Sequence, residues 1–268
     1  MRTVLKLGGE LLEGAAAMNG MAAAIGDLAG RQSVVVVHGG GRAIDAELRA
    51  RGLEPRFVDG LRITDADALE SVVSVLAGRT NTALVAALHA AGVRAVGLTG
   101  ADAGIGLSHK ADLFTTAAGE RVDLGLVGQP RHAPPTLLQD LTALHYVPVV
   151  ASIGITDDGT LLNVNADTLA GHLASALRAN RLVIAGGTAG VLDGNGKTIE
   201  ALSLEDLETM IASGEAHSGM VAKLVACRNA LQGGVDEVAI VPGHGVTDFN
   251  RAEGTRIMPA PLTCGRLA

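Results

Sequence analysis

The chain has 268 residues, which suits one large α/β domain or two closely packed lobes. Hydrophobic residues make up 48% of the sequence, but only three Phe, one Tyr and no Trp are present. The core must therefore be mainly aliphatic, as in buried parallel strands covered by helices. The formal net charge of -7 argues against a general nucleic-acid binder, because such a protein would carry a basic face.

The cysteines and the apolar runs indicate the cellular environment. Cys227 and Cys264 are far apart and lie in no metal-ligand spacing, so a reduced cytosolic pair is expected. The sequence does not open with a basic segment followed by an apolar stretch, and no apolar run approaches the ~20 residues of a membrane helix. We therefore expect a cytoplasmic protein that neither spans a membrane nor binds nucleic acid.

Predicted strands and helices alternate along the chain. Short apolar runs bounded by turn residues predict strands, and Ala- and Leu-rich stretches with apolar spacings of three and four predict helices. The expected strands are residues 4–7, 34–37, 93–98, 147–151, 182–185 and 235–241, with a hairpin over one face at 105–127 and a last short edge strand at 254–258. The expected helices are residues 15–28, 43–50, 65–91, 134–144, 167–178, 203–213 and 219–231. This alternation predicts a mostly parallel sheet with helices on both faces.

Two glycine stretches follow the first two predicted strands: KLGG at residues 6–9 and HGGG at residues 38–41. Glycine allows backbone N–H groups to approach an anion, and the N-terminus of a following helix adds positive potential. The stretches match neither GxxxxGK[ST] nor GxGxxG, which argues against a P-loop NTPase or a nicotinamide enzyme. They predict a phosphate or carboxylate cradle, with Lys6 supplying a positive charge.

Several polar residues at helix starts have two interpretations. Arg62 directly precedes a helix start; it could clamp a carboxylate with both guanidinium nitrogens, or be an exposed surface arginine. Asn163, Asn165 and Asp167 precede another helix, and helix capping explains one of them well. The remaining two are suited to orienting a ligand or a lysine.

Six short motifs occur in the order KLGG, HGGG, DGLRIT, DLGLVG, NVNAD and GMVAK. Together they resemble the amino-acid kinase superfamily and, within it, the N-acetylglutamate kinases, over essentially the whole chain. The resemblance implies an open αβα sandwich around a central, mainly parallel sheet, the carbamate kinase-like fold. It also implies two lobes, with residues 1–177 binding the acyl amino acid and forming the dimer and residues 178–268 binding ATP.

The reaction that the resemblance implies is transfer of the γ-phosphoryl group of ATP to the side-chain carboxylate of N-acetylglutamate, in arginine biosynthesis. A carboxylate is already a nucleophile at pH 7, so electrostatic stabilisation and positioning should dominate catalysis. By resemblance, Lys6 and Lys223 neutralise the moving phosphoryl group and Asp167 holds both lysines. Gly9 and Gly40 would offer backbone N–H groups to it.

The resemblance also assigns the binding residues. Gly41 would help to bind the acceptor, while Arg62 and Asn163 would fix its α-carboxylate. The nucleotide would lie against Gly186, Gly187, Thr188 and Gly190. Mg²⁺ is expected to be held mainly by the ATP phosphates and not by protein ligands. His38 is expected to have a structural role, because the acceptor has no proton to remove.

Two departures from the family pattern and two alternatives remain. Residues 186–188 read Gly-Gly-Thr where the family usually has Ser/Thr-Asp-Val, which leaves the details of ATP binding open. Lys6 leaves no room for the N-terminal helix of the arginine-inhibited hexameric members, so a homodimer without that feedback is expected.

The first alternative is a kinase for an acetylated or carrier-linked aminoadipate in lysine biosynthesis. The second is a non-catalytic ligand sensor on the same fold.

Overall fold

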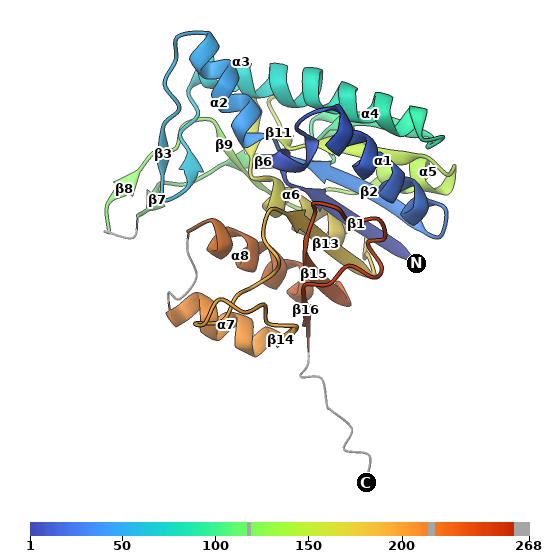
Figure 1. Cartoon of the computed structure of the whole chain (residues 1–268). Helices are drawn as coiled ribbons and strands as arrows, with labels where there is room; N and C mark the ends of the chain where they lie inside the picture. The colour runs from blue at the N-terminus through green and yellow to red at the C-terminus, as the bar shows by residue number, and fades with distance from the viewer. Residues whose placement is uncertain (117–118, 214–217, 260–268) are drawn as a thin grey trace.

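The computed structural model describes residues 1–116, 119–213 and 218–259, and an eight-stranded sheet runs through its middle (Figure 1). The strand order is β14-β16-β15-β13-β1-β2-β10-β5. All neighbouring strands are parallel except β15 and β16. The bounds are β1 (Arg2–Leu7), β2 (Ser33–His38), β5 (Ala95–Thr99), β10 (Val147–Ala151), β13 (Arg181–Gly186), β14 (Ala201–Ser203), β15 (Glu237–Pro242) and β16 (Thr255–Met258). The predicted α/β class with a mainly parallel sheet is confirmed.

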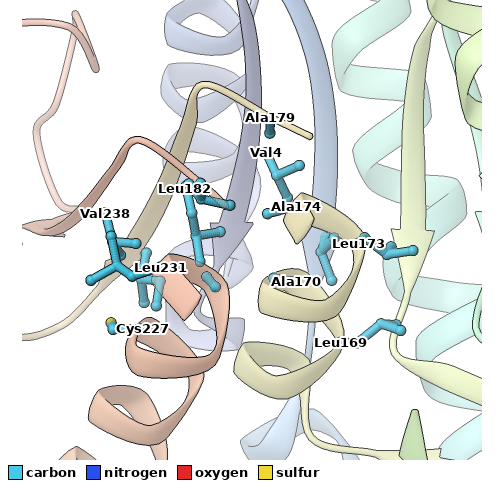
Figure 2. Close-up of a cluster of buried hydrophobic side chains, with 14 of the residues drawn as sticks. Val4, Leu169, Ala170, Leu173, Ala174, Ala179, Leu182, Cys227, Leu231 and Val238 are labelled. Carbon is cyan, nitrogen blue, oxygen red and sulfur yellow. The ribbon is translucent and has the colours of Figure 1, made fainter. Parts of the chain in front are cut away.

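Helices cover both faces of this sheet. Successive residues of each strand point to opposite faces, so each strand contributes apolar side chains to both layers of helices. Leu5 of β1 packs with α1 (Ala15–Ala29) and α4 (Asn81–Ala90) on one face. On the other face, Val4 packs with α5 (Thr136–Ala143), α6 (Ala166–Ala176) and α8 (Ser218–Gln232), as Figure 2 shows for part of this cluster. Helix α7 (Leu204–Ser213) packs against α8. The core is thus mainly aliphatic on both sides, as the composition predicts, with Phe249 buried on the α1 face.

A third cluster of apolar side chains lies near the carboxyl ends of β2 and β10. It is built from α2 (Gly41–Ala50), α3 (Ala66–Val73), the π-helical turn η2 (Ser74–Thr80) and the end of β10. Two short 3₁₀ turns, η1 (Gly9–Leu12) and η3 (Asp102–Gly104), follow β1 and β5. These elements surround the edge of the sheet at which the glycine stretches lie.

A smaller sheet and two hairpins stand beside the main sheet. The smaller sheet has the order β11-β12-β9-β6, and the hairpins pair β3 with β4 and β7 with β8. The bounds are β3 (Phe57–Val58), β4 (Leu61–Arg62), β6 (Ser108–Lys110), β7 (Phe114–Thr115), β8 (Arg121–Val122), β9 (Val127–Pro130), β11 (Ile153–Ile155) and β12 (Leu161–Val164). The antiparallel hairpin expected within residues 105–127 is confirmed by β7 with β8, while β6 pairs with residues 128–130 of β9, just beyond the predicted segment; residues 117–118 of this hairpin lie outside the described residues.

The last strand predicted at residues 254–258 is present as β16, but its predicted position at the edge of the sheet is wrong. Strand β16 lies between β15 and β14, and the outer strand at this end of the sheet is β14. Strand β14 has only three residues, which is too short to give a recognisable alternation. The strands β11 and β12, which lie on either side of residues 156–160, were also missed because each has at most four residues.

The predicted helix at residues 65–91 is one continuous helical run that contains the π turn η2. Asp65 caps it, since Oδ1 accepts a hydrogen bond from the Ala68 N–H at 3.0 Å. By length and composition alone, residues 66–90 could cross a membrane, and 44% of the most apolar window is buried inside the protein. Leu84 and Leu88 are fully buried against the main sheet, as in an ordinary core helix.

Candidate active site

The glycine stretches meet at the carboxyl edge of the sheet, because β1, β2 and β13 are parallel neighbours. In the register of these strands, Leu7 lies opposite both His38 and Ala185. A Cβ atom on Gly9 would lie 2.6 Å from the Gly40 Cα, so the two stretches touch and glycine is required at this contact. The predicted adjacency of the first two loops is therefore a feature of the structure.

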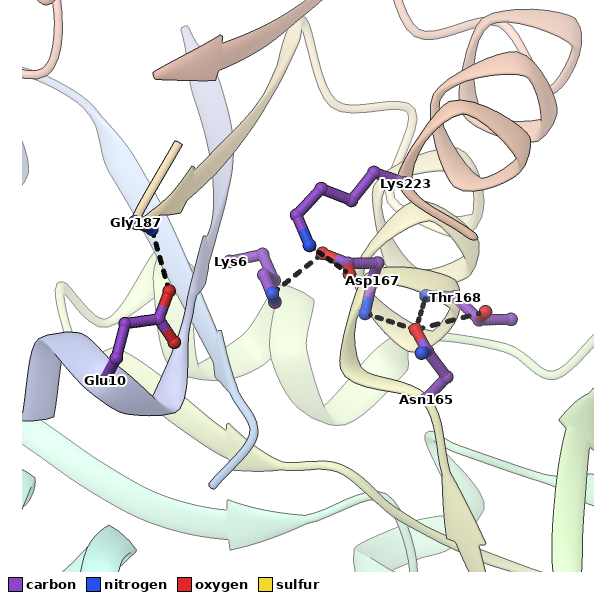
Figure 3. Close-up of polar contacts among 7 residues, drawn as sticks. All are labelled: Lys6, Glu10, Asn165, Asp167, Thr168, Gly187 and Lys223. Carbon is purple, nitrogen blue, oxygen red and sulfur yellow. Dashed lines mark hydrogen bonds and ion pairs between the residues drawn. The ribbon is translucent and has the colours of Figure 1, made fainter. Parts of the chain in front are cut away.

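Lys6 and Lys223 converge on Asp167 (Figure 3). Lys6 Nζ lies 2.8 Å from Asp167 Oδ1, and Lys223 Nζ lies 3.4 Å from Oδ2. Lys6 is at the end of β1, Asp167 is in the first turn of α6, and Lys223 is in the first half of α8. Asn165 caps α6, since its Oδ1 accepts hydrogen bonds from the Asp167 N–H at 2.9 Å and the Thr168 N–H at 3.1 Å. One asparagine is thus a cap, and Asp167 is free to contact the lysines.

The charge of Asp167 depends on its two partners. Burial alone would raise the pKa of the carboxyl group, but the charges and hydrogen bonds of Lys6 and Lys223 lower this pKa overall. The carboxylate therefore stays ionised at neutral pH. The three residues together carry a net charge of about +1 at the edge of an acidic protein, which suits an anionic ligand.

Arg62 is not an exposed surface residue, because its side chain is only 7% exposed. Its Nη2 forms an ion pair with Asp45 Oδ1 at 2.6 Å and donates a hydrogen bond to the Gly41 carbonyl oxygen at 3.2 Å. The guanidinium carbon lies 4.7 Å from the centroid of the Phe57 ring. The Nη1 atom is buried and has no hydrogen-bond partner among the described residues. Such an unpaired buried donor is costly unless a ligand satisfies it.

Asn163 lies close to the same place. Its Nδ2 donates a hydrogen bond to the Thr64 Oγ1 at 3.0 Å, and Thr64 Oγ1 in turn lies 3.4 Å from the Arg62 carbonyl oxygen. Thr64 is fully buried, and its backbone is joined to the loop that contains Gly125. Arg62 is thus linked to Gly41 through its side chain and to Asn163 through Thr64.

A cavity of about 1140 Å³ lies between the loop after β13 and the helices α7 and α8. Thr188, Gly190 and Lys223 line it, together with apolar side chains such as Met210 and Met220. Gly186 and Gly187 are not among its lining residues. Of the four residues predicted to bind the nucleotide, Thr188 and Gly190 line the cavity, whereas Gly186 and Gly187 lie at the end of β13.

Glu10 and Asp45 also contact the site, although neither belongs to the six sequence motifs. Glu10 Oε1 accepts a hydrogen bond from the Gly187 N–H at 2.8 Å (Figure 3), and Asp45 holds Arg62. A weak signal existed for Asp45, because it lies four residues after Gly41 and therefore on the same face of α2. Glu10 directly follows the KLGG stretch, but a carboxylate there gave no indication that it reaches a second glycine loop.

Neither a metal cage nor a reactive thiol is present in the part of the chain that the structure describes. No group of three or more His, Cys, Asp or Glu side chains is placed to hold a metal ion there. Cys227 is fully buried, and burial raises the pKa of its thiol, so it is expected to be unreactive. Cys264 lies outside the described residues.

The comparisons with known proteins agree with this geometry. Residues 1–242 match the model of the amino acid kinase family. The chain is 41% identical to the acetylglutamate kinase of Methanopyrus kandleri over 248 residues, which cover 91% of this chain and 96% of that protein. It is 40% identical to the acetylglutamate kinase of Symbiobacterium thermophilum over 248 residues, which cover 90% of this chain and 84% of that protein.

Solved structures share the fold. N-acetylglutamate synthase from Neisseria gonorrhoeae, complexed with coenzyme A and N-acetyl-glutamate, superposes with a TM-score of 0.83 at 25% identity. That match covers 97% of this chain but only 60% of the synthase chain. Carbamate kinase from Giardia lamblia bound to AMP-PNP superposes with a TM-score of 0.67 at 15% identity, over 97% of this chain and 98% of that chain. The chain belongs to the amino acid kinase family, in the group of the acetylglutamate kinases.

Proposed function

We propose that this protein transfers the γ-phosphoryl group of ATP to the side-chain carboxylate of N-acetyl-L-glutamate, giving N-acetylglutamyl 5-phosphate for arginine biosynthesis. The observation that carries the proposal is the convergence of Lys6 and Lys223 on Asp167 beside the contact of Gly9 with Gly40. The names of the relatives support the choice of acceptor.

The lysines and glycines would stabilise the transferring phosphoryl group. The acceptor carboxylate is ionised at neutral pH, so the site needs no general base, and the barrier is the approach of one anion to another. Lys6 lies at the glycine loops and Lys223 at the cavity, so each would neutralise charge from its own side. Asp167 would position both ammonium groups. The N–H groups of Gly9 and Gly40 would donate to the phosphoryl oxygens.

The acceptor would be held by Arg62, Gly41 and Asn163. The buried, unpartnered Nη1 of Arg62 suits one oxygen of the α-carboxylate, and Asp45 keeps the guanidinium in place. Because Arg62 also donates to the Gly41 carbonyl oxygen, the acceptor would lie directly beside the HGGG loop. In this arrangement its side-chain carboxylate would point towards Gly40 and Lys6.

ATP would occupy the cavity beside α7 and α8, with Thr188 and Gly190 at its edge. Its volume of about 1140 Å³ is large enough for a nucleotide, and its apolar side chains suit a base. Gly186 and Gly187 would complete the loop behind the phosphates. Mg²⁺ would enter as part of the Mg-ATP substrate, held mainly by phosphate oxygens and water, because both oxygens of Asp167 already face lysines.

We also propose which part of the chain binds each substrate. Residues 1–177 would bind the acyl amino acid and form the dimer, and residues 178–268 would bind ATP. Strand β5 supports a homodimer, because it is the outermost strand of the main sheet and its residues are at most half-buried. An open strand edge of this kind is a natural site for pairing with a second copy. A cytoplasmic location fits a protein that uses ATP.

The test is acceptor-dependent turnover. ADP release with Mg-ATP is measured against N-acetylglutamate, N-acetylaminoadipate and glutamate, and acyl phosphate is trapped with hydroxylamine. Selective turnover of N-acetylglutamate is expected. Preference for the aminoadipate analogue would favour the sibling kinase, and ligand binding without turnover of any acceptor would favour a sensor. Light scattering after size-exclusion chromatography tests the dimer, and a monomer at micromolar concentration would contradict it.

A further inference from the structure

Asn81, the first residue of α4, lies behind the HGGG loop and is 4% exposed. Its Nδ2 lies 2.8 Å from the Val149 carbonyl oxygen, 3.3 Å from the Leu98 carbonyl oxygen and 3.1 Å from His38 Nε2. Two of these three neighbours are carbonyl oxygens, which can only accept, so the nitrogen of the amide must face them. The Asn81 Oδ1 fits above β5 only because residue 97 is glycine, since a Cβ there would lie 2.2 Å from it.

This orientation of Asn81 fixes the tautomer of His38. An amide nitrogen has two hydrogens, shared here among three neighbours, and it cannot accept, so a proton on His38 Nε2 would face another donor. Nε2 is therefore the unprotonated ring nitrogen, and the ring proton lies on Nδ1. Nδ1 lies 3.2 Å from the Gly39 carbonyl oxygen and therefore donates to it. The ring is fully buried, and burial lowers the pKa of His38 to about 4, so the imidazole is neutral at physiological pH.

The hydrogen bond to the Gly39 oxygen orients the next amide. A trans peptide unit is planar, and its C=O and N–H groups point in opposite directions. The peptide between Gly39 and Gly40 is trans, so holding the Gly39 oxygen towards His38 turns the Gly40 N–H away from it. Gly40 is the N-cap of α2, where no side chain caps the helix. The N–H groups at this helix start have no acceptor within the helix.

The π turn η2 supports the loop from the same side. A Cβ atom on Gly40 would lie 2.8 Å from Leu76 Cδ2, so the side chain of Leu76 lies directly against the Gly40 backbone. Asn81 follows this turn without a break in the helix. Single π turns within α-helices are frequent at functional sites. The same helical run therefore contacts the loop twice, through Leu76 and through the Asn81–His38 pair.

We infer that Asn81 is a positioning residue for phosphoryl transfer: acting through His38, it aims the Gly40 N–H at the transferred phosphoryl group. The inference rests on the proposed function, because it assigns the Gly40 N–H to that group. Asn81 itself touches neither substrate. Its contribution is to make the loop rigid in the orientation that the transition state requires.

Kinetics of four variants test this role. Asn81→Ala and His38→Leu should each lower kcat about tenfold or more and leave the KM values for ATP and N-acetylglutamate within about twofold, because a transition-state contact is misaligned. His38→Asn should recover only part of kcat, since its amide nitrogen can take the place of Nδ1 and donate to Gly39 but no ring nitrogen remains to accept from Asn81. Asn180→Ala is the matched control; Asn180 is an exposed asparagine with hydrogen bonds at the amino end of β13, and its replacement should change neither parameter. Unchanged kcat in folded Asn81→Ala, or a loss confined to KM, would overturn the inference.

Two further measurements do not depend on turnover. In the presence of N-acetylglutamate, ADP with fluoroaluminate, a mimic of the transferring phosphoryl group, should bind the wild-type protein more tightly than ADP alone. Asn81→Ala should keep the ADP affinity and lose about tenfold of this gain. Equal loss for both ligands would contradict a positioning role.

The tautomer can be read directly from the wild-type protein. Long-range ¹H–¹⁵N correlation spectra of His38 should show a neutral ring with the proton on Nδ1, and a proton on Nε2 would overturn the inference even if no variant folds. If the wild-type protein turns over none of the acceptors, the proposed function is contradicted. The tautomer measurement would still test the Asn81–His38 pair.

Discussion

The Lys6 ammonium group lies 2.8 Å from the Asp167 carboxylate, and their side chains are only 8% and 7% exposed. The pair joins the end of β1 to the first turn of α6, where two helices and two glycine loops meet. A buried ion pair contributes little net stability, because desolvation offsets the attraction. Its value here is positional, since a lysine held in this way has little freedom to move away from the site.

Removing either lysine charge should affect the chemical step. Lys6→Met and Lys223→Met keep the length of the side chain and remove its charge, so each should lower kcat about a hundredfold or more. The measurement is steady-state ADP release with saturating substrates. Lys110→Met is the control, because Lys110 forms a surface pair with Asp123 in which both side chains are at least half exposed. Equal kcat in all three variants would contradict the assigned roles.

Removing the carboxylate should affect stability as well. Asp167→Asn leaves the Lys6 charge buried without its partner, which should cost about 3–5 kcal/mol in the free energy of unfolding. Urea denaturation followed by circular dichroism measures this loss. Asp123→Asn removes the exposed partner of Lys110 and should change the unfolding midpoint little. A similar small shift for both variants would show that the Lys6–Asp167 pair is hydrated in solution.

The guanidinium group of Arg62 should affect the KM for the acceptor and not the KM for the nucleotide. Arg62→Lys keeps the charge but loses the planar pair of donors, so the KM for N-acetylglutamate should rise about tenfold or more while the KM for ATP stays constant. Arg31→Lys, at an arginine that is 56% exposed, should be neutral. A rise in the KM for ATP alone would mean that Arg62 faces the other substrate.

Glu10 should oppose nucleotide binding. Its carboxylate occupies the Gly187 N–H and lies against Gly8, where a Cβ would come within 2.4 Å of Oε1. Glu10→Gln keeps an acceptor for Gly187 and removes a charge near the phosphates, so the KM for ATP should fall about fivefold, equivalent to about 1 kcal/mol. Glu54→Gln, at an exposed carboxylate, serves as the control. A higher KM in Glu10→Gln would mean that the carboxylate assists binding, for example through Mg²⁺.

The buried imidazole of His38 should make stability depend on pH. Burial lowers its pKa from 6.5 to about 4, so the unfolded chain binds a proton more readily than the folded protein. The contribution is fully present above pH 6.5 and is lost as the pH falls towards 4, by about 3 kcal/mol in total. Comparing the free energy of unfolding of the wild-type protein and His38→Asn between pH 4 and 7.5 isolates this effect. A difference that does not change with pH would contradict the burial of a neutral ring.

Local patterns predicted the parts of the fold that are strongly periodic or punctuated by glycine. The apolar runs of β1, β2 and β13 and the glycines after them were identified because burial of a parallel strand leaves a continuous apolar signal. The π turn at Ser74–Thr80 could not be predicted, since the sequence of the long helix shows no break there. The position of β14 outside β16 depends on long-range pairing, which a three-residue segment does not encode locally.

The candidate site was predicted through short motifs, and its supporting contacts were not. The motifs identified Lys6, Asp167 and Lys223. In the structure the Asp167 carboxylate contacts both ammonium groups, that of Lys6 at 2.8 Å and that of Lys223 at 3.4 Å. Asp45 and Glu10 were missed because each has its partner far along the chain, 17 residues on at Arg62 and 177 residues on at Gly187. No local pattern signals a contact of that kind; only the folded chain brings these partners together.

Phosphoryl transfer to the carboxylate oxygen can be followed with an isotope. N-acetylglutamate carrying ¹⁸O in its side-chain carboxylate is incubated with Mg-ATP and the protein, and hydroxylamine is added to cleave the acyl phosphate at carbon. The bridging oxygen then leaves with phosphate, so we expect inorganic phosphate that contains one ¹⁸O, together with N-acetylglutamyl hydroxamate in equal amount. ADP formation with unlabelled phosphate and no hydroxamate would mean that water is the acceptor, and it would contradict the account.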